Sequence, residues 1–252
     1  MIEIFLLSLI QGVTEFLPIS SSSHLILFSN FTNFTTDGLA LDVSLHIGSF
    51  LAVLTYFRND ITDFIQNKDL FLKILVSSIP VMLLGFFLVQ TNFIEKLRSV
   101  EVIGWTTFIF GVLLYVSDKY KLEKNIRNDF NFKSAILIGL FQVLSLVPGV
   151  SRSGITITAA RLLNFKRFDA AKISFLLSIP TLGAVSIFGL KNLLSSDNIN
   201  FSLLNLILIF LSFIFSLITI KYFLKYIKNF SLNIFVFYRV ILGLTILLIA
   251  YL

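Results

Sequence analysis

The chain is dominated by apolar runs that are long enough to cross a lipid bilayer. A helix of about 20 apolar residues spans the hydrocarbon core. Only 13% of the residues are charged and 56% are hydrophobic, whereas a soluble domain carries about 25% charged residues. The sequence therefore predicts an all-α integral membrane protein, a single membrane domain over residues 1–252. Its six predicted transmembrane helices lie at about 39–57, 71–90, 102–117, 172–190, 203–224 and 234–252.

Two further apolar segments, 4–28 and 134–160, are each interrupted near the middle by proline and serine. The first interruption begins at Pro18 and reads PISSSS, and the second begins at Pro148 and reads PGVSRS. Unwound backbone at membrane depth is tolerated only where protein or a water-filled cavity covers it. We therefore expect two re-entrant helix-loop-helix hairpins, each of which leaves the membrane on the side from which it entered.

The basic residues sort to one side of this arrangement. The loops at about 58–73, 118–133, 161–172 and 221–228 share a side and contain most of the 20 lysines and arginines, whereas the other side carries Lys96, Arg98 and Lys191. Because cytoplasmic loops are enriched in lysine and arginine, we expect both chain termini on the external face. The same bias accounts for the net charge of +6, so we expect no nucleic-acid partner.

An internal repeat relates two halves of the chain, 1–118 and 133–252. LIQGVTEFLPIS at 9–20 resembles LFQVLSLVPGVS at 140–151. Each half holds one hairpin and three spans, and because the number of spans is odd the two repeats are inverted. In inverted repeats with broken helices the broken ends form the binding site. We therefore expect one site built from both breaks.

The first break contains residues suited to anion and proton chemistry. Gln11 and Glu15 are four positions apart, on one face of a helix. An ionisable residue inside a span is costly and indicates a functional site, the alternative being an interfacial or hydrogen-bonded Glu15. The serines from Ser20 to Ser23 can cap the next helix, whose free N–H groups bind anions. His24 follows and can serve as a general base, a general acid or a nucleophile.

The second break places an arginine inside the membrane. Arg152 lies between Ser151 and Ser153, after the flexible Gly149. Its planar guanidinium suits phosphate oxygens. The alternative is a structural ion pair with Glu15, and the two interpretations overlap because a phosphate can displace a carboxylate.

Other features narrow the chemistry. The chain has no cysteine, which excludes disulfides and thiolate catalysis, and it has no Walker loop, GxSxG elbow or HExxH motif. The first residues lack a basic region and a cleavage pattern, so we expect them to be part of the mature protein. His46, with Asp42 four positions earlier, either supports the site or satisfies its own hydrogen bonds, and we favour the second interpretation.

With these motifs the chain resembles the undecaprenyl-diphosphate phosphatase family of bacterial membranes, also called the bacitracin-resistance family. The Gln11 and Glu15 pair, the following FLPISSSSH and the Pro-Gly-x-Ser-Arg-Ser-x-x-Thr motif from Pro148 to Thr156 carry the resemblance, which extends over essentially the whole chain. It implies hydrolysis of undecaprenyl diphosphate to the monophosphate and inorganic phosphate, which recycles the lipid carrier of peptidoglycan and cell-wall synthesis and confers bacitracin resistance. It also implies a bacterial inner membrane location and a site that opens to the external face.

The resemblance also implies roles for individual residues. Glu15, Ser21, His24 and Arg152 would be catalytic, and whether Ser21 or His24 is the nucleophile stays open. The substrate-binding residues would be Gln11, Ser20, Ser22, Gly149, Ser151, Ser153, Gly154 and Thr156. A divalent cation, Mg²⁺ or Ca²⁺, would bind Glu15 together with Gln11. Gln11 departs from family members with Glu there, so Glu15 is the only carboxylate of the motif.

Two other interpretations remain beside a phosphatase. A transporter or flippase of a lipid-linked phosphate would use the same anion site and explain the inverted repeats, but it does not need the Ser21 and His24 pair. A non-catalytic scaffold explains the intramembrane ionisable residues poorly. The expected partner is a polyprenyl diphosphate lipid in the membrane, and a homodimer is kept open beside a monomer.

Overall fold

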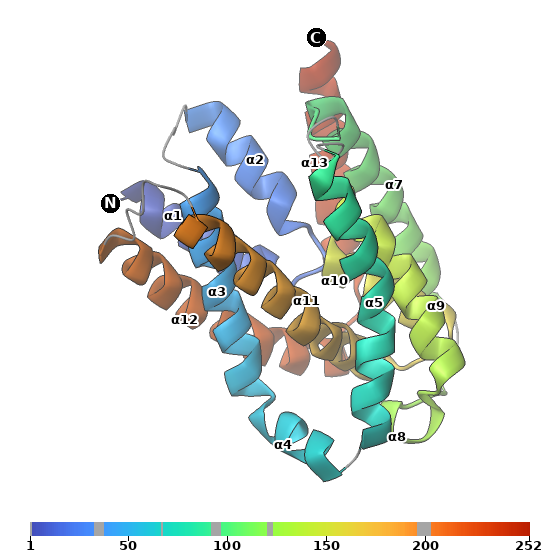
Figure 1. Cartoon of the computed structure of the whole chain (residues 1–252). Coiled ribbons are helices and arrows are strands. Elements are labelled where there is room, and N and C mark those ends of the chain that lie inside the picture. Colours follow the sequence, from blue (N-terminus) through green and yellow to red (C-terminus); the bar gives the residue numbers. More distant parts are fainter. Residues whose placement is uncertain (1, 33–37, 67, 92–96, 120–122, 196–202) are drawn as a thin grey trace.

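The structure of the chain, a computed structural model, describes all residues except 1, 33–37, 67, 92–96, 120–122 and 196–202 (Figure 1). Within the described residues it is built from helices, with one isolated bridge between Lys124 and Phe165. The helices are α1 (Ile2–Thr14), α2 (Ser21–Thr32), α3 (Gly38–Tyr56), α4 (Arg58–Gln66), α5 (Lys68–Gln90), α7 (Val100–Asp118), α8 (Ile126–Asp129), α9 (Phe132–Val143), the 3₁₀ turn η1 (Leu144–Leu146), α10 (Arg152–Leu162), α11 (Arg167–Ser195), α12 (Leu203–Asn229) and α13 (Asn233–Tyr251).

The predicted class, an all-α protein with several membrane spans, is confirmed. In the described part of the chain five helices, α5, α7, α11, α12 and α13, are long and apolar enough to cross a membrane. The sixth predicted span is α3, which passes the same test together with α4 at a bend of 72°. The short helix α4 was not predicted, and it lies where the chain turns away from α3.

Each predicted break separates two short helices. The segment 15–20 lies between α1 and α2, and η1 with the segment 147–151 lies between α9 and α10. The apolar helices before the breaks, Ile2–Thr14 and Phe132–Leu146, are too short to cross a bilayer. In Figure 1 the first turn of α1 and the last turn of α2 lie on the same side of the molecule, as expected of a hairpin that turns back.

The most extensive helix–helix contacts join helices from the two halves of the sequence. Helix α3 packs along α12, α7 along α13, and α5 along α9. Two glycines let α12 come close, since a Cβ added at Gly12 would lie 2.5 Å from the Cβ of Phe215, and one at Gly48 would lie 2.4 Å from the carbonyl oxygen of Ile209. Small residues at such contacts are typical of membrane helix packing. Neither half therefore packs as a separate unit, although the predicted inverted symmetry stays a prediction.

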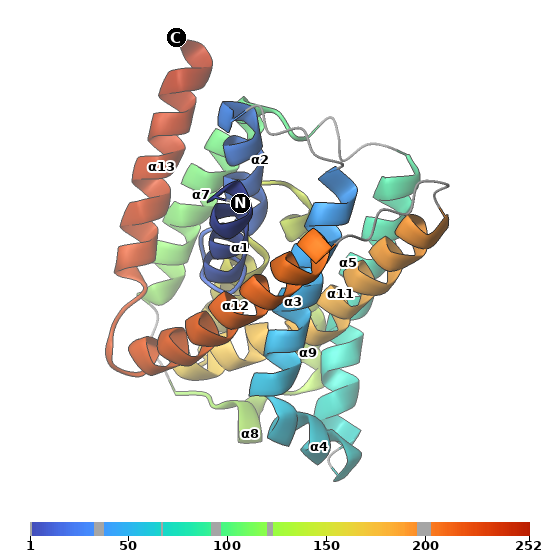
Figure 2. The same cartoon turned by 90° about the vertical axis from the view of Figure 1, so that its left-hand side faces the viewer.

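The C-terminal end of α13 and the basic loops lie at different ends of the molecule. Figure 2 shows α4 and α8 at the lower end, whereas the C-terminus extends from the upper end of α13. Most of the loops that are rich in lysine and arginine belong to the lower end, as the predicted topology requires.

A buried ionic cluster joins four helix ends at the basic end. Asp118, the last residue of α7, accepts two hydrogen bonds from Arg167, both at 2.9 Å. Its carboxylate also accepts from Nε of Arg161 at 3.1 Å and from the backbone N–H of Leu232 at 3.2 Å. Arg161 is fully buried. One carboxylate thus connects α7, α10 and α11 with the start of α13.

Asp118→Asn is expected to destabilise the protein strongly, because it leaves two arginines without their counter-charge and one of them is fully buried. Removing one partner of a buried ion pair costs about 3–5 kcal/mol. Thermal unfolding in detergent is the measurement. The matched control is Asp69→Asn, which removes an exposed partner of Lys73 and is expected to cost about 1 kcal/mol or less. Equal shifts for both variants would contradict a structural role for the Asp118 cluster.

Candidate functional site

The two breaks in the helices have matching backbone geometry. Ser20 has φ 76° and directly precedes α2, and Ser151 has φ 71° and directly precedes α10. Positive φ is rare for residues other than glycine, and its cost is accepted mainly at functional sites. Each strained serine thus turns the chain so that a helix begins at the break. The positive dipole end of a helix is then present at both breaks.

The second break needs a glycine at its centre. Gly149 has φ 92°, and a Cβ added there would lie 2.0 Å from Oγ1 of Thr106. Thr106 Oγ1 donates a hydrogen bond to the carbonyl of Pro148 at 2.6 Å. The close approach of α7 therefore fixes the loop. Gly149 contributes to the site by allowing this loop shape.

Arg239, on α13, holds the two loops together from behind. It is fully buried, and its guanidinium donates hydrogen bonds to four backbone carbonyl groups. The acceptors are Pro18 at 3.2 Å in the first loop, Gly149 at 2.8 Å and Val150 at 3.0 Å in the second loop, and Thr107 at 3.3 Å on α7. In the part of the chain that the structure describes, no carboxylate forms an ion pair with it. The arginine therefore donates hydrogen bonds to carbonyl groups of the unwound loops, which lipid could not pair.

A second link runs directly between the loops. The hydroxyl of Ser153 donates to the carbonyl of Leu17 at 2.7 Å. Gly154 allows Arg239 to approach, because a Cβ there would lie 2.8 Å from Nη1 of the arginine. The expectation that the two breaks lie together is therefore confirmed by the contacts between them.

The carboxylate of Glu15 is the centre of the side-chain network. Its Oε1 accepts from Nη2 of Arg152 at 2.7 Å. Its Oε2 accepts from the hydroxyl of Ser21 at 2.6 Å and from the amide nitrogen of Gln11 at 3.1 Å. The side chains of Glu15 and Arg152 are only 7% and 13% exposed. One buried carboxylate therefore orients the guanidinium of Arg152 and the hydroxyl of Ser21 at the same time.

These groups line a cavity of about 220 Å³. Its polar wall includes Glu15, Ser21 and Arg152, with hydroxyl groups of both breaks around them. Its apolar wall comes from three other elements, namely α5, η1 and α11, with the side chains Val81, Leu146, Leu182 and Val185. A cavity with one polar and one apolar wall suits a ligand with an anionic head and a hydrocarbon tail.

The predicted site residues divide between this cavity and the layer behind it. Lining the cavity are Glu15, Ser20, Ser21, Ser22, Ser151 and Arg152. Behind them lie Gln11, Gly149, Ser153, Gly154 and Thr156, all buried. Thr156, for example, donates to the hydroxyl of Ser174 at 2.7 Å. The second group shapes the loops and orients the first.

We expected His24 at the reacting groups, but among the described side chains it is His46 that lines the cavity. His24 is not among the described side chains that line the cavity, and its Nε2 is 2.6 Å from the hydroxyl of Tyr238, on which the ring stacks. His46, for which we favoured a merely local role, lines the cavity with Glu15 and Arg152. Whether His24 is catalytic stays a prediction.

Sequence reasoning did not connect Arg239 with the site, and for His46 it favoured the local role over the cavity position that the structure shows. Both are polar residues inside a predicted span, and that was the available signal. The sequence does not state which face of α3 or α13 turns toward the breaks, so the signal could not be connected with the site.

The donors at the site do not form a metal cage. Among the described residues no three His, Cys, Asp or Glu side chains come together in a way that could hold a metal ion. Glu15 already accepts three hydrogen bonds, and Gln11, whose Oε1 has no partner among the described groups, does not belong to the lining of the cavity. Mg²⁺ prefers six oxygen ligands and often takes several from substrate phosphates. The site fits a cation that arrives with a diphosphate, but not one held by protein ligands alone.

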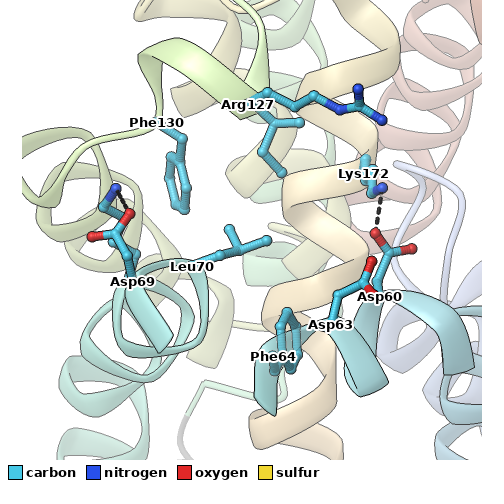
Figure 3. A pocket seen from close by; sticks show the side chains of 10 residues that line it. Asp60, Asp63, Phe64, Asp69, Leu70, Arg127, Phe130 and Lys172 are labelled. Carbon is cyan, nitrogen blue, oxygen red and sulfur yellow. Dashed lines mark hydrogen bonds and ion pairs between the residues drawn. The ribbon is translucent and has the colours of Figure 1, made fainter. Parts of the chain in front are cut away.

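A second cavity, of about 390 Å³, lies at the end of the molecule that carries α4 and α8 (Figure 3). Its wall combines acidic and basic side chains that pair with one another, Asp60 with Lys172 at 2.5 Å and Asp69 with Lys73. None of the motif residues lines it. This cavity is therefore not the candidate site.

Comparison with known proteins gives one consistent result. The family profile described as "Bacitracin resistance protein BacA" matches residues 4–245. A protein of Pelagibacter ubique (strain HTCC1062) named Undecaprenyl-diphosphatase is 48% identical over 251 residues, which cover 99% of this chain and 98% of that protein. Proteins of the same name from Saccharophagus degradans and Jannaschia sp. are 45% and 39% identical, over 94% and 98% of this chain and 93% and 98% of their own lengths.

Arg239→Lys is expected to destabilise the protein although it keeps the charge. An ammonium group at the end of a flexible stem cannot reach four carbonyl groups that a planar guanidinium reaches, and each buried acceptor left without a donor costs about 1–3 kcal/mol. Thermal unfolding in detergent is the measurement. The control is Arg58→Lys at the exposed start of α4, where little change is expected. An unchanged melting temperature for Arg239→Lys would contradict the bridging role.

Proposed function

The chain belongs to the bacitracin resistance protein BacA family, and we propose on this basis that it hydrolyses undecaprenyl diphosphate to undecaprenyl phosphate and inorganic phosphate. The observation that carries the proposal is the 2.6 Å hydrogen bond from the hydroxyl of Ser21 to Glu15, beside the ion pair of Glu15 with Arg152. A nucleophile, a base and an anion-binding group thus meet in one amphipathic cavity. Phosphoryl transfer depends mainly on such positioning and charge stabilisation.

The diphosphate binds at the polar wall. Arg152 offers a guanidinium that can donate two parallel hydrogen bonds to phosphate oxygens, and it sits at the start of α10, where free N–H groups also favour an anion. Helix α2 presents its own start beside Ser21. The apolar wall from Val81 to Val185 accommodates the first part of the prenyl chain.

Ser21 is the nucleophile of the proposed reaction, and Glu15 is its base. The oxygen of Ser21 attacks the terminal phosphorus while its proton passes to Glu15. The bond from that phosphorus to the bridging oxygen breaks, so undecaprenyl phosphate leaves with the bridging oxygen and a phosphoserine remains. Water then attacks the phosphoserine, its phosphorus–oxygen bond to Ser21 breaks, and Glu15 returns the proton to the serine.

His24 is a weaker choice for the nucleophile. Its Nδ1 is 2.6 Å from the carbonyl oxygen of Ser20 and must carry the hydrogen there, because a carbonyl can only accept. Its Nε2 is bound to the hydroxyl of Tyr238. Both nitrogens are engaged, and neither is directed into the cavity with Glu15 and Arg152. A transporter, our alternative from the sequence, is not favoured by any observation at this site.

We propose that the divalent cation, Mg²⁺ or Ca²⁺, enters together with the diphosphate and that Glu15 would provide the protein's oxygen ligand, while Gln11 donates a hydrogen bond to Glu15 from behind the cavity wall. When bound, the cation neutralises charge on the diphosphate. The donor set described above supports this order of binding, because the protein alone offers too few ligands.

The charge distribution supports a proposal for the location. We propose the bacterial inner membrane, with the basic end of α4 and α8 in the cytoplasm and with the termini and the cavity toward the external face. The positive-inside bias supports this orientation, and a reporter fused after Leu252 measures it. The homodimer stays a prediction, which the mass of the purified protein in detergent measures.

Replacing Ser21 or Glu15 is expected to slow phosphate release strongly. Ser21→Ala removes the nucleophile and should lower kcat on the order of 10³-fold or more, and Glu15→Gln should lower it about 10²–10⁴-fold because the amide cannot accept the proton. The assay is phosphate release from undecaprenyl diphosphate by purified protein. The control is Ser29→Ala, an exposed serine on the same helix α2. Normal release by Ser21→Ala would contradict the proposed nucleophile.

Cation binding is expected to depend on the lipid. Calorimetric titration of Mg²⁺ or Ca²⁺ into lipid-free protein should show no binding below the millimolar range, and a methylene-bridged prenyl diphosphonate should create a site, because it supplies the missing oxygen ligands. A chelator should lower phosphate release. Tight binding to the lipid-free protein that is lost in Glu15→Gln would contradict this order and favour a protein-held cation.

A further inference from the structure

His46 presents an unused hydrogen-bond acceptor near the reacting groups. Its side chain is half-buried and lines the same cavity as Glu15, Ser21 and Arg152. It comes from α3, which contributes none of the groups assigned to the reaction above.

The tautomer of His46 follows from its hydrogen bond. Nδ1 is 2.7 Å from the carbonyl oxygen of Asp42, one helical turn earlier. A carbonyl oxygen can only accept, so Nδ1 carries the hydrogen and Nε2 of the neutral ring carries a lone pair. Within the part of the chain that the structure describes, Nε2 has no hydrogen-bond partner. Helix α3 therefore fixes the ring and leaves one acceptor available to a ligand.

The second step of the proposed reaction requires such an acceptor. The attacking water must approach phosphorus in line with the bond to Ser21, whereas Glu15 is hydrogen-bonded to Ser21 and so belongs to the leaving side. Glu15 also holds the proton from the first step and must return it. Orientation of the water therefore has to come from another element of the cavity wall.

We propose that Nε2 of His46 accepts a hydrogen bond from this water and orients it toward the phosphoserine, an inference that rests on the proposed function. The water oxygen bonds to phosphorus and keeps one proton, and its other proton passes to a phosphoryl oxygen. The bond from phosphorus to the Ser21 oxygen breaks, Glu15 gives that oxygen its proton, and dihydrogen phosphate leaves. His46 acts as an acceptor throughout and does not have to change its charge.

The test compares two replacements of His46 in purified full-length protein. His46→Gln keeps an acceptor, the side-chain carbonyl, whereas His46→Leu has similar bulk and no acceptor. With undecaprenyl diphosphate, His46→Leu should release one equivalent of undecaprenyl phosphate per protein in a rapid burst and then inorganic phosphate about 10²-fold more slowly than the wild type. After an acid quench its phosphoserine should be detectable. His46→Gln should stay within about tenfold of the wild type, and the control is Thr55→Ala, an exposed position on the same helix.

Each outcome decides the proposal. A phosphoenzyme that accumulates in His46→Leu and not in His46→Gln supports the water-orienting role, because a purely structural defect would slow both steps. Unchanged release by His46→Leu overturns it, and so does equal loss in both variants or a slow first step without a burst. Absence of phosphate release by the wild type would instead overturn the proposed function itself. Gel filtration and melting temperature identify a variant that fails to fold, and His46→Ala then replaces His46→Leu.

Discussion

The site depends on how buried, unwound backbone is satisfied at membrane depth. Lipid offers no hydrogen bonds, so each carbonyl that leaves a helix must find a donor within the protein. Arg239 supplies donors for carbonyls of both loops and of α7. Because one planar group makes these bonds at once, it fixes the loops relative to each other as well as satisfying them. The placement of Glu15 next to Arg152, 137 positions away in the sequence, follows from that fixed distance.

The packing of helices from one half of the chain against helices from the other half also fixes the site. Helices α3 and α12, α7 and α13, and α5 and α9 each combine the two halves, and the cavity is closed by elements of both. No half could form the site alone, since each contributes one break and part of the wall. The buried Asp118 cluster joins the ends of α7, α10 and α11 to the start of α13. Stability and site geometry are therefore properties of the whole bundle.

The parts of the structure that could be predicted are those determined by residues close together in the sequence. Spans follow from apolar length, and breaks follow from Pro18, Pro148 and the serines beside them, because proline and strained turns act on their own neighbourhood. The pairing of Glu15 with Arg152 could be expected because two isolated charges in a membrane need each other. The roles of the histidines could not, since whether His24 or His46 faces the cavity depends on how α2 and α3 are rotated by their packing. Arg239 was equally hidden, because its partners are backbone carbonyls, which leave no pattern in the residue types.

The ion pair between Glu15 and Arg152 also links binding to reaction. In the lipid-free site Arg152 occupies Oε1 of Glu15 at 2.7 Å, and a carboxylate that is shared with a guanidinium is a poorer base than a free one. A diphosphate carries more negative charge than the carboxylate and offers the guanidinium a matching pair of oxygens. In the proposed reaction Arg152 turns toward the diphosphate, and Glu15 keeps its hydrogen bond to the hydroxyl of Ser21. In the proposed reaction one carboxylate is therefore the partner of Arg152 in the empty site and the base in the occupied one.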